Sequence, residues 1–586
     1  MPYRSRPRSR VVTGFIAAAI SALTAFGATV PARASAGAVL RVGVIEEPRT
    51  LNVAVGTGPV PREVWNLSYA RLTSRDADAL ALTSGLAVSW QPSDGGRSYT
   101  YTLRDGVRWS DGEPLTAADV AYTINRANKE RWAAYDEVAG LSAEVIDHRT
   151  VVVSSQEPDP RLPALEVPIV PRHVYEPVAA ESLAGYPGDD GVGSGPFTVT
   201  DWKRGDRIRL DANPRWWGGA SEVGAIEIVF FDDAAALLDA VARGEVDFAE
   251  GLPSSMIREV EQKRDVSTIT ARGSRYHVLS INTVDGNAAL RDVEVRRAIS
   301  TAVDRDSLVS EIVNGVGTPQ SDLPASLSPQ WARDLDYDNQ THFDPLRARA
   351  ILDEAGYVDS DDDGTRETPD GSPIELRLSI PGGDQEARIA KLIAGWLGDV
   401  GIGVEVRKAE QLPWDAGAGE RFDLALQARV ATLDPDAALA SFVCPEQLQA
   451  ADEPARWCDD RYDQMYRRQH DDTDATRRHA TVEAMLQRVD EQVPAAVLFV
   501  EDRVQAYRTD RFKGWVRQPE DVGPVLFGET SPSYLVLEAQ PAAASSKGAK
   551  ILVAGALMLF ATGGAAATWL VLRRRAAPRP EASPPG

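Results

Sequence analysis

A run of acidic residues between positions 359 and 370 has the spacing of a calcium-binding loop. Its D-x-D-x-D-G pattern and the two acids that follow supply the candidate ligands Asp359, Asp361, Asp363, Glu367 and Asp370. Carboxylate oxygens at this spacing can surround Ca²⁺, with the glycine at the sharp bend. The twelfth position holds Asp370, where glutamate is usual. We expect either a structural calcium, the one cofactor that the sequence suggests, or an acidic surface loop.

Motifs of the common enzyme classes are absent from the sequence. It contains no H-E-x-x-H, no G-x-S-x-G and no P-loop, and its six histidines are scattered. Lone histidines are more often packing residues than catalysts. Acids are abundant, but no pair is singled out as a glycosidase dyad. We therefore predict that the protein is not an enzyme and has no catalytic residues.

Both ends of the chain carry targeting signals. Arginines precede an apolar run and small residues follow it, which describes a secretory signal peptide over residues 1–36. Residues 551–572 are uncharged and would form a helix about 33 Å long, enough to cross a hydrocarbon core of about 30 Å. Arginines then open the tail 573–586, so the positive-inside rule places that tail in the cytoplasm. We expect a single-pass cell-membrane protein with an extracellular body and an Ala/Ser-rich linker at 539–550.

The expected extracellular body is strongly acidic. The whole chain has 63 basic and 86 acidic residues and a net charge of −23. The two ends hold eleven of the bases and one acid, which leaves 52 bases against 85 acids, a formal charge of −33. Nucleic acid requires a basic surface, so we exclude it as a partner.

Cys444 and Cys458 are the only cysteines. In an oxidising compartment outside the cell, two cysteines at this separation favour a disulfide. The alternative is a pair of metal ligands, which would need partners such as His470 or His479. No compact zinc-type spacing of cysteine and histidine occurs.

The body is long enough for more than one lobe. About 500 residues exceed what one hydrophobic core usually supports. Strand-like runs are interspersed with helical segments throughout, which indicates a mixed α/β class; the runs are 39–45, 150–154, 226–231, 374–380 and 404–407. Asp344 and Pro345 predict the start of a helix that ends at Gly356.

Residues 99–126 carry the clearest local pattern. Tyr99, Tyr101 and Leu103 alternate with threonines, which predicts a strand with one buried face. After two turns, Thr116 with Asp119 three residues later predicts a capped helix that runs through residue 128. The amino-acid sequence of this segment resembles a segment shared by the family 5 extracytoplasmic solute-binding proteins of oligopeptide and dipeptide ABC importers.

The resemblance extends, in order, along nearly all of residues 39–538. Further matching segments are GSGPF (193–197), DWKRGD (201–206), NPRWWG (213–218), AVARGEVDF (240–248) and VRRAISTAVD (295–304). It implies an α/β, two-lobed periplasmic-binding-protein-like clamshell with an extra subdomain in the first lobe. Peptide-binding relatives also carry a similar cysteine pair.

The resemblance further implies domain boundaries. These are lobe I at 37–282 with a subdomain at about 71–190, lobe II at 283–499, and a return to lobe I at 500–538. Two crossovers, near 279–283 and 496–507, would form the hinge. The protein would be a monomer that works with ABC permease subunits.

Ligand-binding residues follow from the same resemblance. They are Thr57, Gly58, Pro59, Trp65 and Asn66 on the first lobe, and Gly382, Gly383, Trp414, Asp434 and Asp436 on the second. A surface turn at 57–59 and a helix-capping turn at 434–436 are the structural alternatives.

The chain departs from the dipeptide-binding members at their charged positions. Where those relatives hold the peptide termini with an arginine, a tyrosine and an aspartate, this chain has Ile380, Gly382 and Ala431. Unpaired buried charge costs several kcal/mol, so we do not expect tight binding of ordinary dipeptides. A peptide-like small molecule is the expected ligand, with sugar, siderophore or metal chelate as alternatives. A ligand sensor or interaction protein without transport is the alternative function.

Overall fold

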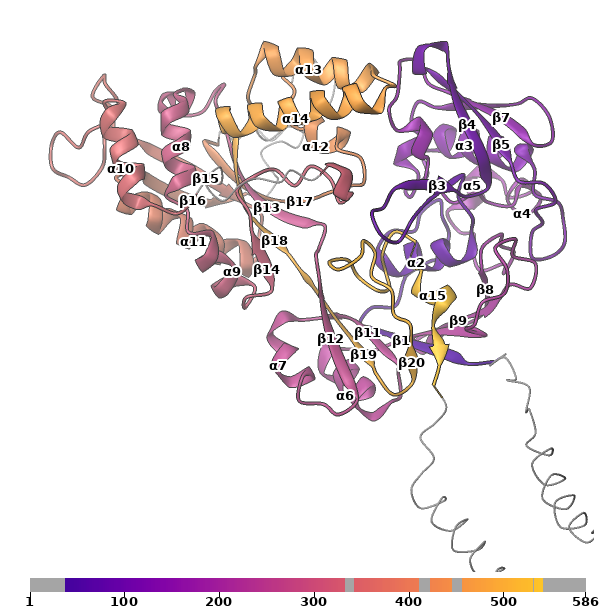
Figure 1. Cartoon of the computed structure of the whole chain (residues 1–586). Coiled ribbons are helices and arrows are strands. Elements are labelled where there is room, and N and C mark those ends of the chain that lie inside the picture. Colours follow the sequence, from indigo (N-terminus) through magenta and orange to yellow (C-terminus); the bar gives the residue numbers. More distant parts are fainter. Residues whose placement is uncertain (1–36, 332–341, 410–421, 445–455, 531, 541–586) are drawn as a thin grey trace, which may run out of the picture.

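Two large β-sheets, joined by two strand crossings, organise the chain (Figure 1). The computed structural model describes residues 37–331, 342–409, 422–444, 456–530 and 532–540. The expected signal peptide and the expected membrane helix lie outside these residues. Within them, no helix combines the length and apolar character that crossing a bilayer requires.

The first lobe is built on a seven-stranded mixed sheet. Its order is β12 (Val266–Ala271), β19 (Arg503–Arg508), β11 (Phe248–Leu252), β1 (Val39–Val44), β10 (Ala225–Phe230), β9 (Arg207–Ala212) and β8 (Phe197–Lys203). The central strand β1 pairs in parallel with both β10 and β11. Such strands are apolar because both faces are covered, and Leu40 and Val42 of β1 are fully buried. The lobe also contains α2 (Pro59–Ser68), α6 (Ala234–Arg243) and α7 (Ile257–Val260).

A subdomain with its own core projects from the first lobe. Its antiparallel sheet has the order β4 (Ala87–Ser93), β5 (Ser98–Leu103), β7 (Thr150–Ser154) and β6 (Ser142–Val145). Helix α3 (Ala117–Glu130) begins with a capping box, in which Thr116 and Asp119 bond to each other's backbone ends. Tyr99, Tyr101 and Leu103 of β5 are buried, while the threonines between them are half-buried. The strand and the capped helix expected from the sequence are thus confirmed.

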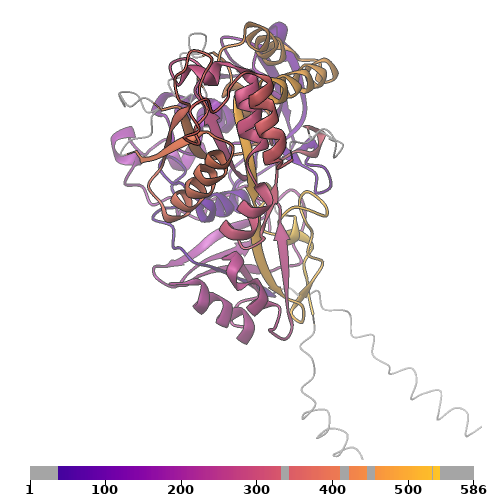
Figure 2. The ribbon, with the colours of Figure 1, turned by 90° about the vertical axis from the view of Figure 1, so that its left-hand side faces the viewer.

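The second lobe is built on a six-stranded sheet. Its order is β14 (Gly317–Pro319), β18 (Ala495–Glu501), β13 (Arg275–Ile281), β17 (Leu424–Val430), β15 (Glu375–Ile380) and β16 (Gly403–Lys408). One group of helices packs in the same core as this sheet, namely α8 (Val293–Thr301), α9 (Arg305–Ile312), α10 (Pro345–Glu354) and α11 (Asp384–Asp399). A second core holds residues of α12 (Asp436–Ala440), α13 (Asp460–Asp471) and α14 (Ala475–Gln492). Figure 1 shows α13 and α14 reaching toward the subdomain, and Figure 2 shows α6 and α7 at the opposite end of the molecule.

The remaining elements are short. They are β2 (Thr73–Arg75), β3 (Leu82–Ser84), α4 (Arg172–Tyr175), α5 (Ala180–Leu183), β20 (Phe512–Lys513), α15 (Ser533–Val536) and β21 (Glu538–Ala539), with 3-10 turns at 94–96, 136–138, 162–164, 254–256, 288–291 and 329–331.

The chain crosses between the two sheets at two adjacent points. Residues 272–274 join β12 to β13, and Asp502 joins β18 to β19. The first crossing precedes the expected segment 279–283, because residues 279–281 belong to β13 inside the six-stranded sheet. The two connections pass very close together, since a Cβ on Gly273 would lie 1.8 Å from the carbonyl oxygen of Glu501.

Candidate functional site

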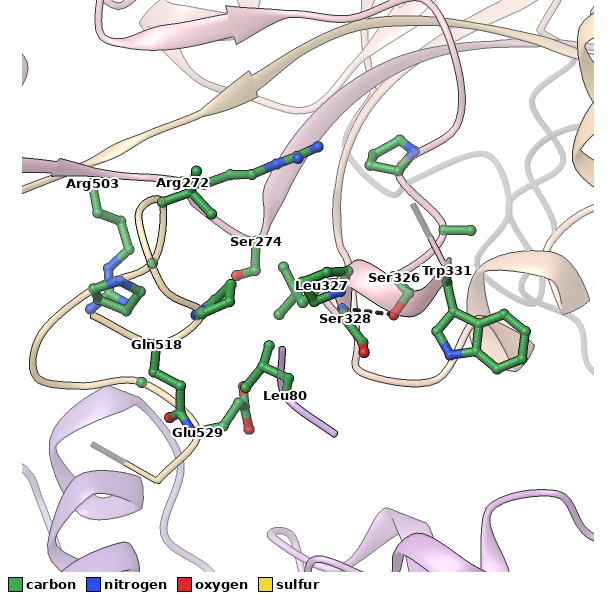
Figure 3. Close-up of a pocket in the computed structure, with 18 of the residues that line it drawn as sticks. Leu80, Arg272, Ser274, Ser326, Leu327, Ser328, Trp331, Arg503, Gln518 and Glu529 are labelled. Atoms are coloured by element: carbon green, nitrogen blue, oxygen red, sulfur yellow. Dashed lines mark hydrogen bonds between the residues drawn. The ribbon is translucent and has the colours of Figure 1, made fainter. Parts of the chain in front are cut away.

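A cavity of about 280 Å³ lies where the two crossings, the second lobe and the returning chain meet (Figure 3). Arg272 and Ser274 come from the first crossing and Arg503 from the start of β19. The second lobe contributes much of 320–331, and the returning chain contributes much of 518–529. Leu80 adds an apolar contact from the first lobe. Because both lobes supply walls, a ligand here would contact both of them.

Paired charges lie directly behind the cavity on the first-lobe side. Arg503 forms an ion pair with Glu250, whose second oxygen accepts a hydrogen bond from Gln505 Nε2 at 2.7 Å. Glu63 is buried and accepts from the backbone N–H of Phe527 at 2.8 Å. Burial lowers the pKa of Arg503, but the charge and hydrogen bond of Glu250, together with the charges of Glu63 and Glu529, outweigh this and the net shift is upward. These contacts fix the returning chain against β11 and α2.

A second group of charges supports Glu529. Arg75 forms an ion pair with the buried Glu166, and Arg71 Nη1 lies 3.6 Å from the same carboxylate. Arg71 and Asn66 also donate to the backbone carbonyl of Glu529, at 3.3 and 3.4 Å. Burial is the main cause of a raised pKa at Glu166. The Glu529 backbone is therefore anchored, while its side chain lies at the cavity beside Gln518 and Leu80 (Figure 3).

The first-lobe residues expected from the resemblance lie around the start of α2. Gly58 precedes the helix with φ +101°, and Pro59 is its first residue. Trp65 is buried and donates from Nε1 to the carbonyl of Leu51 at 2.6 Å. Neither these residues nor Thr57 lines the 280 Å³ cavity, and Asn66 approaches it only through Glu529.

Two expected glycines of the second lobe lie at the start of α11, away from the cavity. Gly382 and Gly383 follow β15, and a Cβ on either would meet the side chain of Lys408 or Glu386 respectively. Neither lines the cavity. Trp414 lies outside the described residues.

Asp434 and Asp436 make contacts within the second lobe. Asp434 forms a bidentate pair with Arg478, at 2.5 and 2.7 Å, and accepts from the backbone N–H of Asp436 at 2.9 Å. Asp436 is 7% exposed and accepts from Gln469 Nε2 at 2.6 Å. Asp434 therefore forms a turn just before α12, whose N-cap Pro435 has no side-chain cap, and the cavity is not lined by either aspartate.

His470 and Asp436 form a pair that faces the subdomain. Nδ1 of His470 lies 3.0 Å from Oδ1 of Asp436. Burial lowers the pKa of His470, but the Asp436 hydrogen bond and charge outweigh it and raise the pKa overall. Asp159 of the subdomain adds to this effect across the space between the lobes. The tips of the two lobes are therefore electrostatically coupled.

The acidic loop brings four of its five candidate ligands together. Carboxylate oxygens of Asp359, Asp361, Asp363 and Glu367 all lie within 4.8 Å of one another. Asp370 is outside this group and accepts hydrogen bonds from Thr368 and Ser372. The four grouped residues have the oxygen donors that Ca²⁺ prefers.

The disulfide between Cys444 and Cys458 is present, as expected. The alternative, a metal site formed by the two cysteines with His470 or His479, is not present among the described residues. His470 pairs with Asp436, and His479 Nε2 lies 2.8 Å from the carbonyl of Gln330.

Sequence reasoning missed the residues that line the cavity. Arg272, Asp322 and Glu529 belong to loops with no motif of their own. The available signal was positional, since Arg272 and Arg503 flank the crossings between the sheets. Binding sites between lobes are expected at such junctions.

Two lobes that are joined by two strand crossings and enclose a cavity between them define a clamshell binding protein. The sequence model of the bacterial extracellular solute-binding proteins, family 5 (middle region), matches residues 81–448, more than half of the chain. The chain therefore belongs to the family 5 solute-binding proteins of ABC importers. It is a binding protein and not an enzyme, as expected.

Known relatives and solved structures agree with this assignment. Oligopeptide-binding protein AppA of Bacillus subtilis (strain 168) is 28% identical over 389 residues, covering 65% of this chain and 70% of AppA. Protein XP55 of Streptomyces lividans is 32% identical over 352 residues, 59% of this chain and 61% of that protein's length. The structure of AppA in complex with a nonapeptide has a TM-score of 0.62 at 23% identity and covers 86% of this chain and 99% of AppA. The structure of NikA of Brucella suis, in complex with Fe(III)-EDTA, has a TM-score of 0.68 at 25% identity. It covers 85% of this chain and 100% of NikA. These neighbours confirm the two-lobed fold.

Proposed function

We propose that the protein captures a peptide-like small molecule outside the cell and delivers it to an ABC permease. The observation that carries this proposal is the cavity between the lobes, with walls from both of them. A ligand that contacts both lobes favours the closed arrangement by its difference in affinity for the closed and open forms. The closed form is then the signal that a permease recognises.

Peptide-like chemistry is supported by the relatives and by the cavity. AppA is named as an oligopeptide-binding protein, and another relative, DdpA of Escherichia coli (strain K12), as a probable D,D-dipeptide-binding protein. The cavity combines apolar side chains, such as Leu327, Trp331 and Phe527, with charged and hydroxyl groups. This mixture suits a compound with apolar substituents on a polar backbone.

The proposal includes tethering of a monomeric body by a helix at 551–572. The described part of the chain begins and ends in the first lobe, at β1 and β21 (Figure 1). A tether there would leave the second lobe free to move. A calcium ion held by Asp359, Asp361, Asp363 and Glu367 is part of the same proposal, supported by their grouped carboxylates.

Two experiments test the proposal. Mass spectrometry of small molecules that co-purify with the protein should identify a peptide-like compound; a sugar, siderophore or metal chelate would refute that ligand class. Uptake of the identified compound should be lost in cells that lack the gene and restored by its return. Normal uptake in those cells would refute delivery to a permease and favour a sensor.

A further inference from the structure

Two carboxylates at the cavity have no hydrogen-bond or ion-pair partner among the described residues. Behind its first-lobe wall, Glu166 and Glu250 lie against the guanidinium groups of Arg71, Arg75 and Arg503. Glu529 is half-buried at the cavity, and its carboxylate has no hydrogen-bond or ion-pair partner among the described residues. Arg503 acts on it only as a more distant charge, because its guanidinium is paired with Glu250. Removing a carboxylate from water without a partner is unfavourable, so an unpaired one at a cavity wall favours a cationic ligand group.

The second unpaired carboxylate comes from the opposite lobe. Asp322 is half-buried and lines the same cavity, and it too has no such partner within the described part of the chain. The nearby Arg272 forms no ion pair with Asp322 among the described contacts; its Nη2 donates to Gln320 at 3.2 Å, and its charge acts on Asp502. Each lobe therefore presents to the cavity one carboxylate that has no hydrogen-bond or ion-pair partner among the described residues.

A buried hydroxyl also indicates a missing partner at this cavity. Ser328 is 1% exposed, lines the cavity beside Leu327 (Figure 3), and its Oγ has no hydrogen-bond partner among the described residues. Its neighbour Ser326 is satisfied, because Ser326 Oγ donates to the carbonyl of Leu433 at 2.7 Å. Buried polar atoms are rarely left unpaired, so a polar ligand atom is the expected partner of Ser328.

We propose that the ligand carries a protonated amine, held by Glu529 of the first lobe and Asp322 of the second, with Ser328 bonding a neighbouring polar atom. This inference rests on the proposed function and specifies its ligand. Dipeptide-binding relatives hold the ligand amine with an aspartate at the position that Ala431 occupies in this chain. In this protein the carboxylates that would hold an amine therefore belong to other elements. A charge-assisted contact from each lobe would strengthen as the lobes close.

The test uses the full chain purified in detergent, with calorimetric titration of short apolar peptides. The peptides are prepared with a free amine, with an acetylated amine, and acetylated with one internal lysine. The variants are Glu529→Gln and Asp322→Asn, which remove charge with little change of shape. Glu520→Gln, an exposed residue outside the cavity, is the matched control.

Peptides with an amine should bind, and Glu529→Gln should weaken them at least tenfold, about the loss expected for one charged hydrogen bond. Glu520→Gln should bind as the unchanged protein does. The lysine form distinguishes a side-chain amine from a terminal one, and tight binding of either supports the inference. Equal binding of the uncharged acetylated peptides, or no effect of either cavity variant, overturns this inference and leaves the proposed function standing. If no peptide form binds, both fail.

Discussion

The contact between the lobe tips depends on the absence of a side chain at Gly96. This residue is the last one of the 3-10 turn between β4 and β5, with φ +91°, and lies opposite Thr473 between α13 and α14. A Cβ on Gly96 would lie 2.5 Å from Thr473 Cγ2, well inside ordinary van der Waals contact. We predict that Gly96→Ala prevents the lobes from closing as far as they do in this structure.

The expected loss of ligand affinity is estimated from two separate free-energy costs. Alanine at positive φ is strained by roughly 1 kcal/mol, and this cost applies whether the lobes are open or closed. The overlap with Thr473 arises only when the lobe tips are as close as in this structure, and an extra methyl in a packed contact costs about 1–3 kcal/mol. The ligand should therefore bind roughly five- to hundredfold more weakly, because it stabilises the closed form.

A matched control separates the two costs. Gly95 also has positive φ, at +64°, but its Cβ would meet no atom within 4 Å. Gly95→Ala should therefore lower stability and leave affinity unchanged. Calorimetric titration would report the affinity, and small-angle X-ray scattering with ligand would report a larger radius of gyration for Gly96→Ala. Adding Thr473→Gly to Gly96→Ala should restore both quantities. If Gly96→Ala matched Gly95→Ala in affinity and radius, Thr473 rotates aside and the reasoning is wrong.

Three further predictions concern stability. Asp423 is 1% exposed and accepts from Arg377 and the backbone N–H of Asn287, so Asp423→Ala should lower the free energy of unfolding by about 3–5 kcal/mol in urea titrations; a loss below 1 kcal/mol would contradict this. His470 has a raised pKa, so its contribution is complete below about pH 6.5 and is lost as the pH rises through the folded-state pKa; the melting-temperature difference between the unchanged protein and His470→Gln should shrink from pH 6 to pH 9, and a growing difference would refute it. Calcium should raise the melting temperature and release heat stoichiometrically, and Asp361→Ala should abolish both effects; no heat in the unchanged protein would rule out the site.

Local features of the fold were predictable from the sequence because neighbouring residues determine them. Thr116 and Asp119 lie three residues apart and satisfy each other's backbone groups, so the start of α3 needs no distant contact. The helix opened by Asp344 follows the same logic, since the Asp344 side chain accepts from the backbone N–H of Arg347. The disulfide was predictable for a different reason, because the chain has no other cysteine.

The cavity was not predictable in this way. Its walls combine residues such as Arg272, Leu327 and Glu529, which lie far apart along the chain. The first crossing was placed too late because β12 and β13 are separated by only three residues, so 266–281 reads as nearly continuous strand. The ion pair of Asp434 with Arg478 on α14 could not be predicted either, because the two residues lie far apart along the chain. Such partners depend on tertiary packing.

The placement of the carboxylates around the cavity determines which lobe would bind a ligand first. Without an acid at Ala431, and with Asp434 paired to Arg478, the second lobe contributes Asp322 as its unpaired carboxylate among the described cavity residues. Glu529 has a firmer support, since Asn66 and Arg71 donate to its backbone and hold it against α2. A preorganised anion binds a cation at lower entropic cost than one on an unsupported loop. A ligand amine should therefore bind the open protein through Glu529, and closure should then add Asp322 and Ser328. Glu529→Gln should accordingly slow association as well as weaken affinity, whereas Asp322→Asn should act mainly by speeding dissociation.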